Sequence, residues 1–126
     1  MKLILAIALG GAIGAVGRHF VSVGMVQLFG HGFPWGTLTV NIVGSFVMGV
    51  LVETMALAWS PAPEMRALLT VGVLGAFTTF STFSLDAVTL FERGEIMPAF
   101  FYVSGSVVAS VAGLFLGLAL MRQVLA

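Results

Sequence analysis

The sequence has no cysteine, and only 8% of its 126 residues carry a formal charge. The lack of cysteine excludes disulfide bonds, thiolate metal sites and thiol redox chemistry. Five Lys and Arg residues balance five Asp and Glu residues, which leaves no basic surface for nucleic acid. We therefore expect neither a redox protein nor a nucleic-acid partner.

Apolar side chains take the place of the missing charges and make up 60% of the chain. A soluble domain of this size has too small an interior to bury them, so the surface itself must be apolar. Four long apolar runs cover approximately residues 3–29, 35–59, 67–91 and 98–121. Because about 20 residues of helix cross a hydrocarbon core of about 30 Å, each run is long enough to span a membrane.

The four runs and their short connections nearly fill the chain. We predict an all-α membrane protein in which residues 1–126 form a single four-span unit in the lipid bilayer. No room remains for a soluble catalytic domain. The first run extends well beyond the short core of a secretory signal, so we expect an uncleaved first span.

The few positive charges give only a weak signal for orientation. Lys2, Arg66 and Arg122 fall on one side of the predicted bundle, whereas Arg93 falls on the other and Arg18 lies toward that second side. Lys and Arg favour the cytoplasmic side, but three against one or two is a small bias. Two alternatives stay open: one orientation with the N-terminus inside, or insertion in both orientations followed by antiparallel pairing.

The middle of the third run contains a stretch that membrane stability alone does not explain. Gly72 and Gly75 precede five hydroxyl residues within the seven positions 78–84, and Phe recurs at positions 77, 80 and 83. Glycine loosens a helix, and Ser or Thr hydroxyls satisfy backbone groups that a break releases. Broken spans of this kind recur at ion sites. We predict a broken third helix, with a straight packing helix as the alternative.

Two further polar tracks occupy the second and fourth runs, with members four residues apart: Thr37, Asn41 and Ser45, and Tyr102, Ser106 and Ser110. An amide in hydrocarbon needs hydrogen-bond partners, and contact between helices is one explanation of such residues. Together with the hydroxyl stretch, however, uncharged donors on three spans indicate a lined path for a small anion.

The same inventory argues against an enzyme. His19 and His31 are too far apart to share a helical face, so we expect no histidine metal site. Glu53 and Asp86 come late in their spans, where we expect them near an interface rather than in a proton relay. Arg18 is interpreted either as an anchor that reaches the interface or as a vestibule charge that attracts anions.

Three segments resemble the Fluc (CrcB-type) fluoride channels, and the resemblance extends over essentially the whole chain. They are residues 75–84 (GAFTTFSTFS), 36–46 (GTLTVNIVGSF) and 10–18 (GGAIGAVGR). The resemblance implies a fluoride-selective passive channel that exports toxic cytoplasmic fluoride through the bacterial cytoplasmic membrane. It also implies an antiparallel, dual-topology homodimer with two pores.

The resemblance further implies a role for particular residues. Along the fluoride pore, Phe80 and Phe83 would form an aromatic box beside the polar residues Asn41, Tyr102, Ser106 and Ser110. At the vestibule the resemblance implies Arg18 and Thr37. The backbone carbonyls of Gly75 and Thr78 would bind a structural sodium ion that is shared by two subunits and is not transported. Two positions depart from the family pattern. Asp86 replaces a common Glu, and Leu114 replaces a common hydroxyl residue.

Two other functions compete with the channel. A small dual-topology multidrug/proton antiporter shares four short spans and a weak charge bias, but it needs a carboxylate deep in its first span. The first run here has none. A purely structural accessory protein would explain the glycines and would leave the hydroxyl stretch without a purpose.

Overall fold

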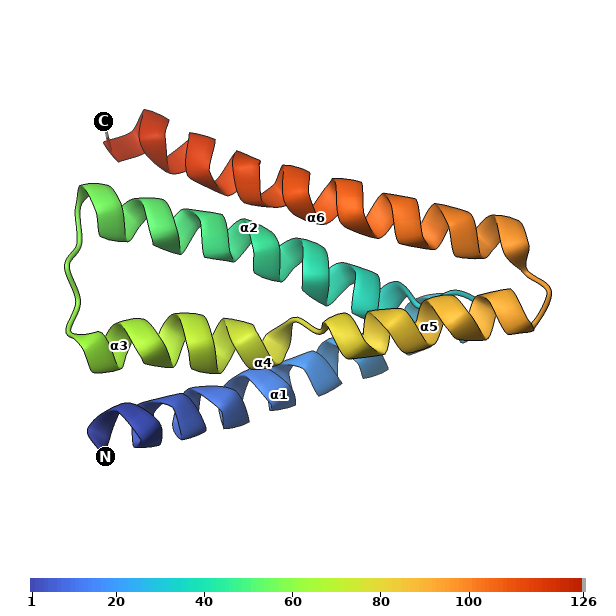
Figure 1. Cartoon of the computed structure of the whole chain (residues 1–126), viewed down its shortest axis with the longest axis horizontal. Coiled ribbons are helices and arrows are strands. Elements are labelled where there is room, and N and C mark those ends of the chain that lie inside the picture. Colours follow the sequence, from blue (N-terminus) through green and yellow to red (C-terminus); the bar gives the residue numbers. More distant parts are fainter. Residues whose placement is uncertain (126) are drawn as a thin grey trace.

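The computed structural model describes residues 1–125, and every regular element in this range is a helix (Figure 1). The elements are α1 (Lys2–Phe29), α2 (Trp35–Leu57), α3 (Pro63–Ala67), the π-helix η1 (Leu68–Leu74), α4 (Gly75–Phe77), α5 (Phe80–Glu92) and α6 (Ile96–Leu125). Elements α3, η1, α4 and α5 together form the third span, so four helical stretches are long and apolar enough to cross a membrane. The predicted four-span, all-α fold is confirmed.

The third span begins earlier than the apolar run indicated. Its first helical residue is Pro63 and its first turn contains Glu64. Proline suits a helix start because it lacks only an N–H that would be unpaired there, and an acidic side chain is favourable beside the positive end of the helix. Local helix-start chemistry thus places the beginning of the helix in what hydropathy marks as a connector.

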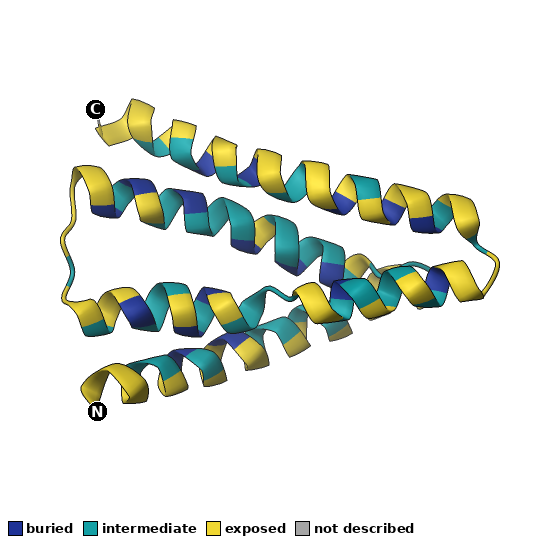
Figure 2. Ribbon diagram, viewed as in Figure 1, coloured by how far each residue is buried: buried dark blue, intermediate teal, exposed yellow. Residues whose placement is uncertain are grey.

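The spans run back and forth, so the two chain ends and the α2–α3 connection lie at one end of the bundle (Figure 1). Lys2, Arg66 and Arg122 belong to that end, and Arg93 belongs to the opposite one. This is the charge distribution that the sequence predicted. Exposed residues line the outer sides of all four spans (Figure 2), and many are large and apolar, such as Phe20, Val108 and Phe115. Such surfaces suit contact with lipid.

Glycines hold α1 closely against η1. A Cβ atom added at Gly14 would overlap the Val73 carbonyl, and one added at Gly72 would lie 2.8 Å from the Gly10 Cα. Real Cβ atoms do not approach so closely, so the two backbones meet only because the side chains are absent. Close contact between small residues is how helices associate in lipid, where hydrophobic attraction between them is weak.

A second glycine contact joins α2 to α6. A Cβ atom at Gly117 would lie 2.9 Å from the Val50 nitrogen and 3.1 Å from the Gly49 Cα. Gly113 also faces α2, but Gly105, earlier in α6, faces open space. Among these three glycines of α6, only the two later ones therefore contact α2.

The third span breaks where the sequence predicted. Thr78 and Thr79 are both extended, with φ and ψ of −85° and 161° at Thr78 and −156° and 125° at Thr79. The Thr79 hydroxyl then caps α5 by accepting the Thr82 N–H at 3.2 Å. The hydroxyl residues supply the cap that starts a new helix inside the membrane.

Candidate functional site

The side chain of Asn41 bridges the break in the third span. Its Nδ2 donates to the Thr79 carbonyl at 3.0 Å, and its Oδ1 accepts the Thr79 N–H at 2.8 Å. One amide thus satisfies both backbone groups of an extended residue that has no helical partner. Unpaired, these groups would each cost several kcal/mol in hydrocarbon. Contact between helices therefore accounts for part of the role of Asn41, and one of its two amide hydrogens stays available.

The break also releases the two carbonyls predicted to bind sodium. In a continuous helix the Gly75 carbonyl would accept the Thr79 N–H, but Asn41 takes that donor. The Thr78 carbonyl would accept the Thr82 N–H, but the Thr79 hydroxyl takes that one. Two hard oxygen acceptors close in sequence are therefore left without their helical partners. This donor set fits a cation such as sodium.

A groove of about 420 Å³ runs beside the break, between α2, α5 and α6. Its lining includes Asn41, Ser45, Thr78, Thr79, Phe80, Phe83, Ser106, Ser110 and Leu114. The structure thus gathers five of the six predicted pore residues around one space. Leu114 makes one part of the groove apolar, at the position where the polar track departs from the family pattern.

Two hydroxyls on α6 are buried without a hydrogen-bond partner among the described residues. They are the Oγ atoms of Ser106 and Ser110, and Ser106 is only 4% exposed. A helical serine often bonds the carbonyl one turn back, as Ser84 does to Phe80 at 3.0 Å. An unpaired buried hydroxyl costs about 1–3 kcal/mol, so these two hydroxyls have the capacity to bind something that enters the groove.

Aromatic rings continue from the groove toward the next turn. The rings of Phe80 and Phe83 lie 5.5 Å apart, and Phe83 lies 5.3 Å from Tyr102. Phe83 is buried, whereas Phe80 is 78% exposed in the single chain. The edge of a phenyl ring carries partial positive charge, so paired rings can stabilise an anion without a formal charge.

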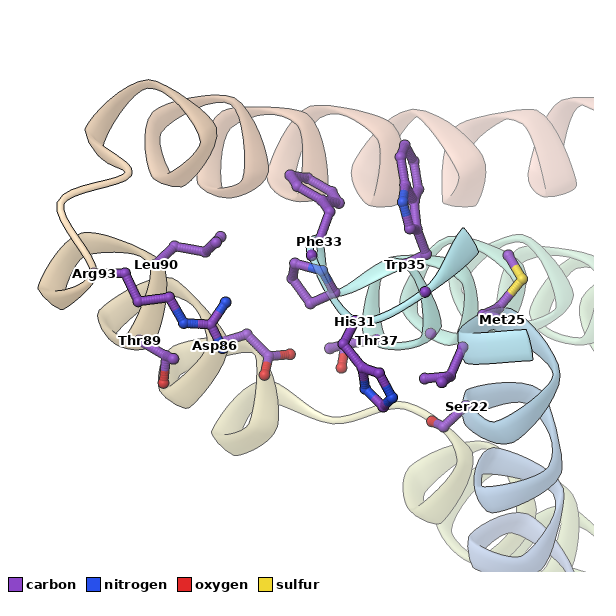
Figure 3. Close-up of a pocket in the computed structure, with 15 residues that line it drawn as sticks. Ser22, Met25, His31, Phe33, Trp35, Thr37, Asp86, Thr89, Leu90 and Arg93 are labelled. Carbon is purple, nitrogen blue, oxygen red and sulfur yellow. The ribbon is translucent and has the colours of Figure 1, made fainter. Parts of the chain in front are cut away.

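Tyr102, the sixth predicted pore residue, lies between the groove and a second cavity. It is fully buried, and its hydroxyl donates to Asp86 Oδ2 at 3.2 Å. The second cavity, of about 220 Å³, lies at the end of the bundle opposite the chain termini and includes Thr37, Asp86, His31 and Arg93 in its lining (Figure 3). Thr37 therefore lines a cavity at this end of the bundle, which we call the mouth cavity, and its role in a vestibule stays a prediction.

The other predicted vestibule residue is placed differently. Arg18 is half-buried on α1 and is not part of the lining of the mouth cavity. No ion pair joins it to an acidic residue within the described chain. The structure thus does not bring Arg18 and Thr37 together.

Comparison with known proteins decides the family. Residues 5–118 match the family described as CrcB-like protein, Camphor Resistance (CrcB). The chain belongs to the CrcB family. Proteins named "Fluoride-specific ion channel FluC" are 56% identical over 126 residues in Rhodospirillum centenum, covering all of both chains, and 56% identical over 120 residues in Agrobacterium fabrum, covering 95% of this chain and 96% of the relative. The one from Rhizobium meliloti is 49% identical over 122 residues, with 97% and 98% covered.

Membership in the CrcB family confirms the resemblance and disfavours the alternative functions. These relatives are named as channels, neither as enzymes nor as antiporters. The accessory-protein hypothesis is also disfavoured, because it assigns no function to the hydroxyl residues at positions 78–84, whereas a channel does. The chain is a multi-pass membrane protein of a bacterial channel family.

Sequence reasoning missed the acidic partners. Asp86 accepts a hydrogen bond from a predicted pore residue, and Glu53, which was expected near an interface, is 9% exposed and forms an ion pair with Arg122. For Glu53 a signal existed, since a carboxylate within an apolar span rarely remains unpaired and Arg122 belongs to the same end of the bundle.

Proposed function

We propose that this chain forms a fluoride-selective channel that lets toxic cytoplasmic fluoride leave passively, down its electrochemical gradient, across the bacterial cytoplasmic membrane. Full-length similarity to proteins named as fluoride-specific channels supports the proposal. The observation that carries it is the pair of unpaired buried hydroxyls, Ser106 and Ser110, facing a groove that also holds Asn41 and two phenylalanine rings.

The proposed path replaces water around the anion by weak, uncharged donors. Ser106, Ser110 and the free amide hydrogen of Asn41 would each donate to fluoride, while Phe80 and Phe83 would present ring edges. None of the described residues that line the groove carries a formal charge. A site of this kind binds an anion strongly enough to admit it and weakly enough to release it.

The ends of the path would be less apolar. Thr37 and Tyr102 would pass the ion between the groove and the mouth cavity. Arg18 would act from the side, through its long-range field rather than by contact, because it does not line that cavity.

We also propose an antiparallel homodimer with a sodium ion at its centre. Phe80 is 78% exposed in one chain although it lines the groove, and a second copy would cover it. Across a two-fold axis the carbonyls of Gly75 and Thr78 would occur twice and supply four oxygen ligands. Sodium would neutralise these carbonyl dipoles and join the two broken helices without being transported.

A liposome assay tests the channel function. Purified protein reconstituted into vesicles loaded with fluoride should release it with an electrical current, and vesicles loaded with chloride should release almost nothing. Proton-coupled movement of an organic cation, with no fluoride current, would instead support the antiporter.

Orientation is tested separately. Adding lysines to the 60–64 connector should favour one orientation, and adding them at 30–34 should favour the other. We expect each variant alone to give cells little fluoride resistance and co-expression to restore it. Full resistance from either variant alone, with orientation confirmed by surface labelling, would exclude the antiparallel pair.

A further inference from the structure

An ion pair with one buried member joins α2 to α6. Arg122 Nε donates to Glu53 Oε2 at 2.7 Å, and Glu53 is only 9% exposed. Both residues lie in the last turns of their helices, at the end of the bundle that holds the chain termini. The pair lines neither the groove nor the mouth cavity, so the proposed fluoride path gives it no role.

The pair matches the register of the two polar tracks. Helices α2 and α6 run side by side in the same direction (Figure 1), and Arg122 follows Glu53 by 69 positions. The same offset pairs Asn41 with Ser110, and Thr37 with Ser106. Parallel helices rise equally per residue, so the ion pair and the two polar tracks belong to one register.

The glycine contact between these helices cannot select that register alone. Gly49 meets Gly117, and Gly113 lies one turn earlier on the same face of α6. If α6 slid by one turn, about 5.4 Å, Gly113 would replace Gly117 opposite Gly49 and the backbones would still fit. The slide would place Ser106 rather than Ser110 opposite Asn41, and Leu118 rather than Arg122 opposite Glu53.

We propose that Glu53 and Arg122 are positioning residues that select the α2–α6 register and thereby align the serines of α6 with Asn41. In the slipped register the Glu53 carboxylate would be buried against leucine without a partner. Leaving a buried carboxylate without its partner is unfavourable, and this penalty separates two registers that glycine packing leaves nearly equal.

Cysteine cross-linking measures the register directly, in a chain that has no cysteine of its own. A Cβ atom at Gly113 would lie 3.9 Å from the Phe46 Cβ, within the range of about 3.5–4.5 Å for a disulfide. Phe46→Cys with Gly113→Cys therefore gives the reference signal of the native register, which it also enforces, because a side chain at position 113 would not fit opposite Gly49. Phe46→Cys with Ala109→Cys reports a slip of one turn.

We expect Arg122→Gln to raise the slipped cross-link, because it leaves a buried carboxylate unpaired. Glu53→Gln should raise it less, since the Arg122 side chain is 62% exposed and can turn to solvent. The exchanged pair, Glu53→Arg with Arg122→Glu, should return the slipped cross-link to the wild-type level. Arg66→Gln is the matched control, because it also removes a positive charge at this end of the bundle, whereas Arg66 is exposed, lines neither cavity and forms no ion pair among the described residues.

Fluoride efflux gives the functional readout, and this part alone rests on the proposed function. We expect Arg122→Gln to slow efflux per assembled channel about fivefold, since the buried Glu53 carboxylate loses its partner and the register population shifts. The exchanged pair should recover the efflux, and Arg66→Gln should match the wild type.

The outcomes separate the two proposals. A slipped cross-link that does not rise in either Gln variant would overturn register selection, whatever the efflux. Cross-links that shift as expected in a protein without fluoride efflux would support register selection and contradict the channel. If neither Gln variant accumulates, the exchanged pair decides: wild-type cross-linking supports the proposal, and a missing or slipped cross-link overturns it.

Discussion

The third span has two halves that differ in how they are held. Before the break, η1 and α4 lie against α1 with glycine backbones in contact and apolar surroundings. After the break, α5 faces α6 across phenylalanine rings and a groove with unpaired serine hydroxyls. Backbones in direct contact are typical of a scaffold, whereas looser packing with unpaired side-chain hydroxyls is typical of a place for a ligand.

Asn41 stands at the boundary between these halves, so changing it should have the largest effect. Asn41→Asp keeps the size but removes the donor to the Thr79 carbonyl and places a charge beside the path. The carboxylate would repel fluoride, and the buried hydrogen bond to Thr79 would be lost. Because the two effects add, we expect fluoride flux to fall about a hundredfold.

The check is efflux across a range of pH, with assembly measured in parallel. Protonation of the new side chain at acidic pH returns a donor, so flux should recover in part. Wild-type flux at neutral pH, in normally assembled protein, would show that the bridge to Thr79 is dispensable.

In the half of the third span before the break, a single added methyl group should destabilise the packing of η1 against α1. Gly14→Ala would overlap the Val73 carbonyl, which is backbone and cannot turn away. Overpacking of this kind costs about 1–3 kcal/mol or more. Gly11→Ala is the matched control, because nothing lies within 4 Å of a Cβ at Gly11. The measurement is the thermal stability of the purified protein in detergent, and equal melting temperatures for the two variants would remove the contrast between the halves.

In the half of the third span after the break, the edges of the phenylalanine rings should affect fluoride flux but not assembly of the dimer. Phe80→Ile or Phe83→Ile keeps the bulk and loses the ring edge, so we expect flux to fall about tenfold, given that a favourable aromatic contact is worth about 0.5–1.5 kcal/mol. The dimer should still assemble. Near wild-type efflux in both variants would show that the rings fill space only.

Much of this contrast could be predicted from the sequence, because its causes are local. Apolar runs predict the spans, and glycines followed by hydroxyl residues predict the break at Thr78 and Thr79. The π-helix, which packs against α1, was not predicted. Its wide turns are rare, and local propensity does not distinguish them from those of an α-helix.

The partners of side chains were harder to predict than the site itself. The residues of the groove could be chosen from their spacing, but the bridge from Asn41 to Thr79 joins positions 38 residues apart. The Glu53–Arg122 pair joins positions 69 residues apart. Such contacts depend on which helices are neighbours and on the register between them. The residue pattern within one helix gives no information on either.

The central claim is that the hydroxyls of Ser106 and Ser110 are unpaired because fluoride uses them. The most direct test measures stability and flux together in Ser106→Ala with Ser110→Ala, against Ser104→Ala, a half-buried serine of α6 that does not line the groove. Removing an unpaired buried hydroxyl relieves a cost, so we predict unchanged or higher thermal stability. A lost hydrogen bond to an anion is worth about 1.5–3 kcal/mol, part of which other donors replace, so we predict about fivefold lower fluoride flux. Unchanged flux, or loss of the fold with no specific loss of flux, would contradict the account.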